Sequence, residues 1–505
     1  MSQTPAGDAT CREREERFER AKRRVGLVAG PVLFMLVLAW PAPSLTREAH
    51  ALLAVFLWAV AYWVTEALPV AVTALLSSVL AIVLGVAPAA RVLAAYADPV
   101  VFLFVGSFIV AEAMKSSGLD RRFALALLRH EWATRSAPRL MLAMGIVTCG
   151  LSLWMSNTAT TAIMLPVGVG VLRALGETAD GAAPSRFAIG LLLMLTWSSS
   201  VAVGVPVGSP PNLIAIGMLR DLTDRRLTFF DWTAVTMPLT VAMLLLCWLL
   251  LGALYRGAPR ASDRLRAYVA GERARLGAWT RAQVNVLVVF LLAALLWMLP
   301  GAAAMASSPT AALPRFFETR LPESAVALGA AILLFVLPTC WSRAEFTLTW
   351  REASRIDWGT ILLFGGGLAM GRLMFDTGLA RAIGEAMVRV SGVQSLWALT
   401  AVAIVIGVVL SETSSNTASA SMVVPVVIAV AQSAGLSPIP PALGAALGAS
   451  FGFMLPISTP PNAIVYGSGL VPLGEMIRSG VYLDVAGAIL IWIGLRLLCP
   501  LLGVI

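Results

Sequence analysis

The chain has 505 residues, of which 58% are hydrophobic and only 13% are charged. Its mean hydropathy of +0.84 is far above that of a soluble globular protein, and it contains many apolar runs of membrane-spanning length. These runs are continuous and do not alternate apolar with polar residues, which disfavours a transmembrane β-barrel. The composition therefore predicts an all-α protein that crosses a membrane many times.

The formal net charge of +9 would suggest a nucleic-acid partner if the protein were soluble. The basic residues are instead concentrated before the first apolar run and in one central segment. They are Arg12, Arg14, Arg17, Arg20, Lys22, Arg23 and Arg24, and then Arg256, Arg260, Arg264, Arg266, Arg273, Arg275 and Arg281. This pattern is typical of cytoplasmic segments and argues against nucleic acid as a partner. It predicts a multi-pass protein of the inner (plasma) membrane with a cytoplasmic N-terminus.

Apolar runs of the length that a bilayer requires, roughly twenty residues, give the expected order of elements. Four spans come first, at 25–42, 49–66, 69–88 and 98–117. The stretch 138–175 follows, with a polar motif near its middle, and it is either two full spans or a hairpin that enters and leaves on one side. The hairpin is favoured because it places the polar motif at membrane depth.

The remaining runs are expected at 187–218, 233–255, 283–300, 323–341, 360–378, 396–433 (a second hairpin), 440–468 and 481–498. This order returns the central basic segment to the cytoplasm and leaves the C-terminus on the extracytoplasmic side. Arg220, Arg225 and Arg226 fall on the outer side and are exceptions to the charge bias.

A polar motif occurs twice in this apolar chain. We name residues 152–158 the first tip and residues 411–417 the second tip. Ser152, Ser156, Asn157 and Thr158 of the first tip recur as Ser411, Ser415, Asn416 and Thr417. Each tip is followed by a proline motif, Gly208-Ser209-Pro210-Pro211-Asn212 and Ser458-Thr459-Pro460-Pro461-Asn462. Prolines stop helices and remove backbone donors, and a break in a membrane helix is tolerated only where it lines a cavity or is buried in protein.

The two halves are similar beyond these motifs, since Phe104-Val105-Gly106 and Phe364-Gly365-Gly366 align at nearly the same offset. In the expected order of spans, matching elements start on the inner side in the first half and on the outer side in the second. The repeats are therefore inverted, and the site of such a fold lies at the repeat interface near the bilayer midplane.

The duplicated residues suit a dehydrated anion held together with a hard cation. Hydroxyls and carboxamides can replace lost water, but a helix N-terminus contributes only about 0.3–1 kcal/mol toward an anion. No arginine or lysine lies in the tips or the proline motifs, so the remaining positive charge is expected from a bound cation such as sodium. A single Ser-Asn-Thr would more simply be a helix cap or a packing face. Its duplication, together with the proline motifs, favours a binding site.

These motifs, with the segment Trp63-Val64-Thr65-Glu66-Ala67-Leu68-Pro69, resemble those of the divalent anion/sodium symporter (DASS) family of the ion transporter superfamily over most of the chain. The resemblance implies about 11 transmembrane helices and two re-entrant hairpins in inverted repeats. It also implies a homodimer in which a transport domain moves past a scaffold by an elevator-type displacement. The implied activity is sodium-coupled symport of C4-dicarboxylates such as succinate, malate or fumarate, with Na+ as the coupling ion. The alternatives are sodium-independent dicarboxylate exchange and transport of citrate or sulfate.

The resemblance also implies roles for individual residues. Substrate carboxylates would meet Asn157, Thr158, Asn416, Thr417 and Thr459. Sodium ions would be held by Ser152, Ser156, Asn157 and the Gly208 backbone, and by Ser411, Ser415, Asn416 and the Ser458 backbone. Two positions depart from the family pattern and bear on coupling, because Val201-Ala202 replaces a usual Gly-Gly pair and Ser411 replaces a common Thr.

The expected organisation is a basic N-terminal segment (1–24), scaffold helices (25–97), a first repeat (98–255), a basic loop (256–282), central scaffold helices (283–358) and a second repeat (359–505). The first repeat holds the hairpin 138–175 and the broken helix 187–218, and the second holds the hairpin 396–433 and the broken helix 440–468. Glu412 adjoins the second tip, where it either tunes the local field or holds the tip by accepting hydrogen bonds.

Other functional classes fit the sequence less well. An intramembrane enzyme would need an activated nucleophile or paired acids within a span, and no such arrangement is evident. A primary pump would need a phosphate-binding loop, which the sequence lacks. Composition alone does not separate a channel from a carrier, but a closed site built twice favours alternating access.

Overall fold

The structure, a computed structural model, describes residues 6–177, 184–223, 226–257, 263–306, 316–317, 319–392 and 395–503. The chain begins with α1 (Ala6–Ala39), α2 (Arg47–Thr65), α3 (Val70–Val83), α4 (Ala89–Ala94), η1 (Ala95–Ala97), α5 (Pro99–Ser116), α6 (Leu119–Leu128) and α7 (Glu131–Thr134). It continues with α8 (Ala137–Ser152), α9 (Asn157–Leu175), α10 (Arg186–Ser200), η2 (Pro206–Gly208), α11 (Pro210–Leu222) and α12 (Phe229–Leu254).

The middle of the chain holds α13 (Asp263–Arg275), α14 (Arg281–Ala306), α16 (Glu323–Val336), β1 (Pro338–Cys340), η3 (Trp341–Arg343), β2 (Glu345–Phe346) and α17 (Trp350–Ala353). The last part holds α18 (Trp358–Asp376), α19 (Leu379–Ser391), α20 (Leu396–Thr413), α21 (Asn416–Ser433), α22 (Ile439–Ala449), α23 (Pro460–Gly467) and α24 (Leu473–Leu501). Within these described ranges, nine helices are long and apolar enough to cross a membrane. The predicted helical membrane fold is confirmed.

Three details differ from the sequence-based expectation. Helix α1 begins at Ala6 and so runs through most of the expected basic N-terminal segment, because its Glu, Arg and Ala residues are good helix formers. The expected basic loop contains α13, although Arg260 lies outside the described residues. The helix expected to end near 341 ends at Val336, and Pro338–Cys340 forms a short antiparallel pair with Glu345–Phe346.

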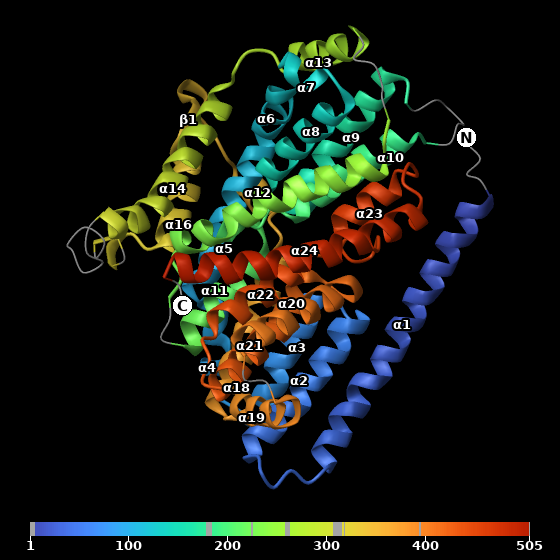
Figure 1. Cartoon of the computed structure of the whole chain (residues 1–505). Coiled ribbons are helices and arrows are strands. Elements are labelled where there is room, and N and C mark those ends of the chain that lie inside the picture. The colour runs from blue at the N-terminus through green and yellow to red at the C-terminus, as the bar shows by residue number, and fades with distance from the viewer. Residues whose placement is uncertain are drawn as a thin grey trace.

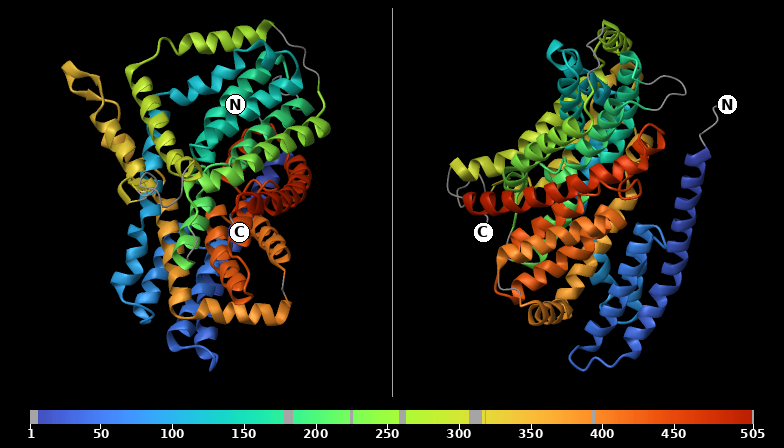
Figure 2. Two further views of the ribbon diagram at one scale, coloured as in Figure 1. Left: turned by 60° about the vertical axis from the view of Figure 1, so that its left-hand side comes forward. Right: turned by 45° about the vertical axis from the view of Figure 1, so that its right-hand side comes forward.

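Two interlocked groups of helices make up the bundle. In Figure 1 helices α6–α10 and α12 occupy the upper part, α18–α22 occupy the lower part, and α24 crosses between them; Figure 2 shows the same division from two further sides. Helix α1 lies at the edge and packs on α2. The two broken helices connect the groups, because α11 descends to pack on α21 while α23 rises to pack on α9.

Four charged side chains form a neutral network where α5, α11 and α18 meet. Arg220 Nη2 lies 2.6 Å from Asp98 Oδ2 and 2.7 Å from Asp221 Oδ1, and Arg372 binds the same two aspartates. Asp98 also caps α5 by accepting from the Val100 amide at 2.8 Å. The two aspartates of the network neutralise the charge of Arg220, which is one of the expected exceptions to the positive-inside charge bias. Arg225, a second exception, lies outside the described residues.

Substituting Arg372→Gln should destabilise the protein, because the buried Asp98 and the largely buried Asp221 would share one cation. Breaking a buried pair costs about 3–5 kcal/mol, and since Arg372 is 31% exposed we expect about 2–3 kcal/mol. The measurement is the thermal unfolding midpoint of the purified protein in detergent. The control is Arg381→Gln, whose pair with Glu385 is exposed on both sides and should shift the midpoint little. Equal shifts for the two variants would contradict a stabilising role for the network.

Candidate functional site

The first tip is the turn between α8 and α9. Helix α8 ends at Ser152 and α9 begins at Asn157, with Ser156 as the N-cap whose Oγ accepts from the Ala159 amide at 3.2 Å. The Ser152 hydroxyl lies 2.8 Å from Asn157 Oδ1 and 2.9 Å from the Ser199 carbonyl at the end of α10. Three oxygen atoms thus converge where two helices end and one begins.

The second tip repeats this arrangement between α20 and α21. The Ser411 hydroxyl lies 2.7 Å from Asn416 Oδ1 and 2.9 Å from the Ala449 carbonyl, at the end of α22. Ser415 is again the N-cap residue, although its hydroxyl makes no capping bond. The duplicated motif therefore encodes a duplicated oxygen cluster, and such hydroxyl, amide and backbone oxygens are the ligands that a hard cation accepts.

Each broken helix contains an irregular segment, which we name the first break (201–209, between α10 and α11) and the second break (450–459, between α22 and α23). Each proline motif starts the helix that follows its break. Pro210-Pro211 and Pro460-Pro461 occupy the first turns of α11 and α23, where a missing N–H costs nothing. The following asparagines then satisfy carbonyls that the break leaves free. Asn212 Nδ2 donates to Val203 and Val205 at 3.2 and 3.0 Å, and Asn462 Nδ2 donates to Gly452 and Leu455 at 2.8 and 3.0 Å.

Gly208 lies where the first break passes close to the first tip. A Cβ on this residue would lie 2.6 Å from the Ala202 carbonyl oxygen and 3.1 Å from that of Leu153. A side chain at this position would therefore press on two backbone oxygens near Ser152 and Asn157. The packing agrees with the expected use of the Gly208 backbone at the first site, which stays a prediction.

Hydrogen bonds between the halves connect the two clusters. The buried Thr196 hydroxyl donates to Asn462 Oδ1 at 2.8 Å, and the hydroxyls of Ser209 and Ser450 lie 3.1 Å apart. Asn416 Nδ2 also approaches the Ser450 carbonyl at 3.4 Å. Among the described residues, no hydrogen bond joins the first tip directly to the second, so the breaks mediate their connection.

The two halves are not equivalent at this junction. The position that matches Thr196 in the second half is Ala446, which has no hydroxyl to offer. Accordingly, Asn212 Oδ1 is buried without a hydrogen-bond partner in the described part of the chain, whereas Asn462 Oδ1 has one. The second break is therefore braced by the first half, but the first break has no matching brace.

Glu412 holds the second break in place. Its carboxylate accepts from the Met454 and Leu455 amides at 2.9 and 3.2 Å and from the Ser458 hydroxyl at 2.5 Å. The structure thus shows the structural role that was one of two open possibilities. The matching residue at the first tip is Leu153, so only the second cluster has a carboxylate beside it.

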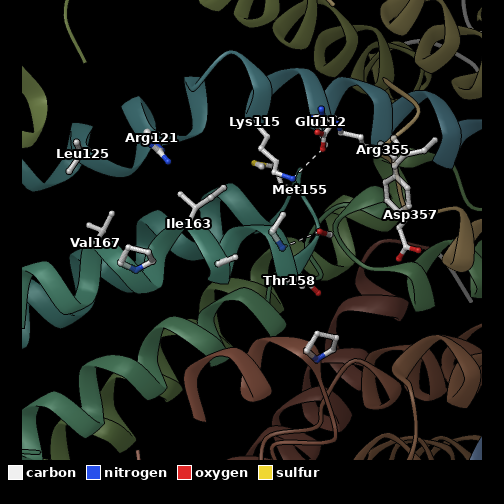
Figure 3. A pocket seen from close by; sticks show the side chains of 18 of the residues that line it. Glu112, Lys115, Arg121, Leu125, Met155, Thr158, Ile163, Val167, Arg355 and Asp357 are labelled. Carbon is white, nitrogen blue, oxygen red and sulfur yellow. Dashed lines mark hydrogen bonds and ion pairs between the residues drawn. The ribbon is translucent and has the colours of Figure 1, made fainter. Parts of the chain in front are cut away.

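The first tip opens into a cavity of about 970 Å³, shown in Figure 3. Ser156, Thr158 and Pro460 line one end of it, and α13 lines the other. At the second tip Thr417 is buried, and so is Thr459, which caps α23 by accepting from the Asn462 amide at 3.4 Å. The first tip is thus accessible through a large cavity, whereas at the second tip these two threonines are buried and Ser415 and Asn416 are half-buried.

Sequence reasoning missed two basic residues of this cavity, Lys115 at the end of α5 and Arg355 before α18. Lys115 pairs with Glu112 at 3.5 Å. Neither residue adjoins a tip in the chain, so no local pattern places them beside Ser156. The tips themselves contain no arginine or lysine, whereas the cavity beside the first tip is lined by both.

Replacing Thr196→Val should destabilise the protein, because it leaves Asn462 Oδ1 buried without a donor. An unsatisfied buried acceptor costs about 1–3 kcal/mol, which thermal unfolding in detergent can measure. The matched control is Thr240→Val, since the Thr240 hydroxyl is buried without a partner within the described ranges, and this change should be neutral or stabilising. If Thr196→Val unfolds at the same temperature as the control, the brace does not contribute.

Comparison with known proteins assigns the chain to a family. The family described as the sodium:sulfate symporter transmembrane region matches residues 21–504. The chain is 30% identical over 501 residues to the sodium-dependent dicarboxylate transporter SdcS of Staphylococcus saprophyticus, covering 97% of this chain and 93% of that protein. It is 29% identical over 480 residues to SdcS of a Staphylococcus aureus strain, covering 93% and 90%.

The fold is also similar to that of the crystallised YdaH transporter of Alcanivorax borkumensis, with a TM-score of 0.52 and 15% identity over 78% of this chain and 84% of that one. This likeness concerns the fold alone. The nearly full-length family match, together with the duplicated tips and broken helices, shows that the chain belongs to the sodium:sulfate symporter family, which includes the divalent anion/sodium symporters.

Proposed function

We propose that the protein is a secondary active transporter that carries C4-dicarboxylates across the inner membrane together with sodium ions. The observation that carries the proposal is the duplicated oxygen cluster, in which Ser152 and Ser411 each join an asparagine to a broken helix. The names of the staphylococcal relatives support both the sodium and the dicarboxylate.

The proposed roles are those that the family resemblance implies, and the oxygen cluster at each tip supports them. Sodium is held by the oxygens of Ser152, Ser156, Asn157 and Gly208 at the first tip, and by those of Ser411, Ser415, Asn416 and Ser458 at the second. The substrate carboxylates are held by Asn157, Thr158, Asn416, Thr417 and Thr459. Because the tips and breaks lack basic side chains, the bound cations supply the positive charge that a dianion requires, and each ligand favours binding of the other.

Transport requires the site to face each side of the membrane in turn. We propose that the helices of the tips and breaks move as an elevator past scaffold helices, and that two copies form a homodimer. Arginine- and lysine-rich segments place the N-terminus in the cytoplasm. Two sodium ions with one dianion carry no net charge, and a third would make transport sensitive to voltage by about 2.3 kcal/mol per 100 mV.

The function is tested by uptake of labelled succinate into proteoliposomes. We expect an inward sodium gradient to drive accumulation, and replacement of sodium by potassium to reduce it to background, because the cations complete the substrate site. An arm with internal unlabelled succinate and no sodium measures exchange. Uptake that depends on internal dicarboxylate but not on sodium would replace symport by exchange, and the absence of succinate uptake in every arm would refute a dicarboxylate carrier.

Asn157→Ala and Asn416→Ala should each abolish sodium-driven uptake, because each removes a carboxamide shared by sodium and substrate. Ser152→Ala and Ser411→Ala should raise the sodium concentration needed for half-maximal uptake. Ser198→Ala is the matched control, since this neighbouring hydroxyl is buried without a partner among the described residues and should be dispensable. Gel filtration establishes that each variant is folded. Normal uptake by both asparagine variants would show that the tips are not the site.

A further inference from the structure

The cavity beside the first tip carries basic side chains that the proposed binding roles do not use. Lys115 comes from the last turn of α5, and Arg355 comes from the segment before α18. Figure 3 shows Lys115, Glu112 and Arg355 together on one wall of the cavity, across from Thr158 of the first tip. The Lys115 side chain is half exposed and Arg355 is exposed, and both line the cavity, so they are available to a solute that enters it.

The charges that line the cavity leave basic groups in excess. Four are basic and three are acidic: Lys115, Arg121, Arg275 and Arg355, against Glu112, Glu272 and Asp357. Arg275 pairs with Glu272 at 2.5 Å. Asp357 is engaged as the cap of α18, where it accepts from the Thr360 amide at 3.1 Å and from the Thr360 hydroxyl at 2.6 Å.

Lys115 and Arg355 therefore retain capacity to bind an anion. The contact between Lys115 and Glu112 is long, at 3.5 Å, and leaves the other protons of the ammonium group free. Arg355 makes no ion pair with any residue that the structure describes. A guanidinium binds a carboxylate through two parallel hydrogen bonds, and an ammonium group adds a compact charge.

Lys115 and Arg355 lie at one end of the helix pair α5 and α18, whereas the charged side chains of the network at its other end are paired with one another. Helices α5 and α18 pack together, with the rings of Phe104 and Phe364 5.1 Å apart. At their other end Asp98, the cap of α5, and Arg372, near the end of α18, belong to the neutral four-charge network. At the cavity end the corresponding charges stay open to solvent.

We propose that Lys115 and Arg355 form a holding station for the dicarboxylate within the cavity, distinct from the oxygen clusters at the tips. The proposal rests on the proposed function and adds a second binding position for the same substrate class. Station and tip are carried by different elements, because Ser156 and Thr158 belong to α9, which packs on α10 and α23. The fixed positive charge on the wall across from the tip raises the local concentration of a dianion in the cavity.

The test measures succinate KM separately on the two faces, using inside-out and right-side-out vesicles from cells that express the protein. We expect Lys115→Gln and Arg355→Gln each to raise the KM on the cavity side roughly threefold to tenfold, and to weaken its dependence on ionic strength. The KM on the other side should not change. Glu112→Gln should lower the KM on the cavity side, because it frees Lys115 from its partner.

The control is Arg129→Gln, an exposed arginine at the end of α6 that does not line the cavity. The station is refuted if the Lys115 and Arg355 variants, folded by gel filtration, keep the KM of the unmodified protein, or if they change both faces equally. It is also refuted if Glu112→Gln raises the KM. Failure of the proposed function is separate, since the unmodified protein would then show no sodium-driven succinate uptake on either face.

Discussion

The structure depends on how two broken helices satisfy their free backbone groups inside a membrane. A helix that stops at Ser200 or Ala449 leaves carbonyls with no partner, and hydrocarbon offers none. Here the Asn212 and Asn462 carboxamides each bind two carbonyls of the irregular segments that follow, while the Ser152 and Ser411 hydroxyls reach the Ser199 and Ala449 carbonyls near the ends of α10 and α22. The serine hydroxyls that satisfy these backbone carbonyls are therefore also members of the two oxygen clusters.

The two halves of the chain also interlock around these groups. Because α11 packs on α21 and α23 packs on α9, each tip is supported by the broken helix of the other half as well as by its own. Thr196 and Ser209 then bond across the repeat boundary, to Asn462 and Ser450. The two halves are consequently joined by short, buried contacts.

The two half-sites nevertheless differ in ways that matter for the cycle. Glu412 fixes the second break, whereas its counterpart Leu153 cannot accept a hydrogen bond from backbone amides. The first tip faces a large cavity, whereas Thr417 and Thr459 at the second site are buried. The neutral network of Asp98, Arg220, Asp221 and Arg372 ties α5, α11 and α18 together at the end away from this cavity. The two half-sites thus differ both in the groups that support them and in how far their threonines are exposed.

The sequence by itself determined the helical membrane fold, the two tips, the breaks and the residues that belong to each, because hydrophobic periods, prolines and repeated polar motifs act locally along the chain. Ser152 with Asn157, and Ser411 with Asn416, lie close in sequence, so their contacts were within reach of motif reasoning. Only the tertiary structure decided that Thr196 braces Asn462, that Glu412 holds its break, and that Lys115 and Arg355 share a cavity with Ser156. These contacts join residues far apart in the chain, and their existence depends on how α5, α9 and the two broken helices pack, which no local pattern specifies.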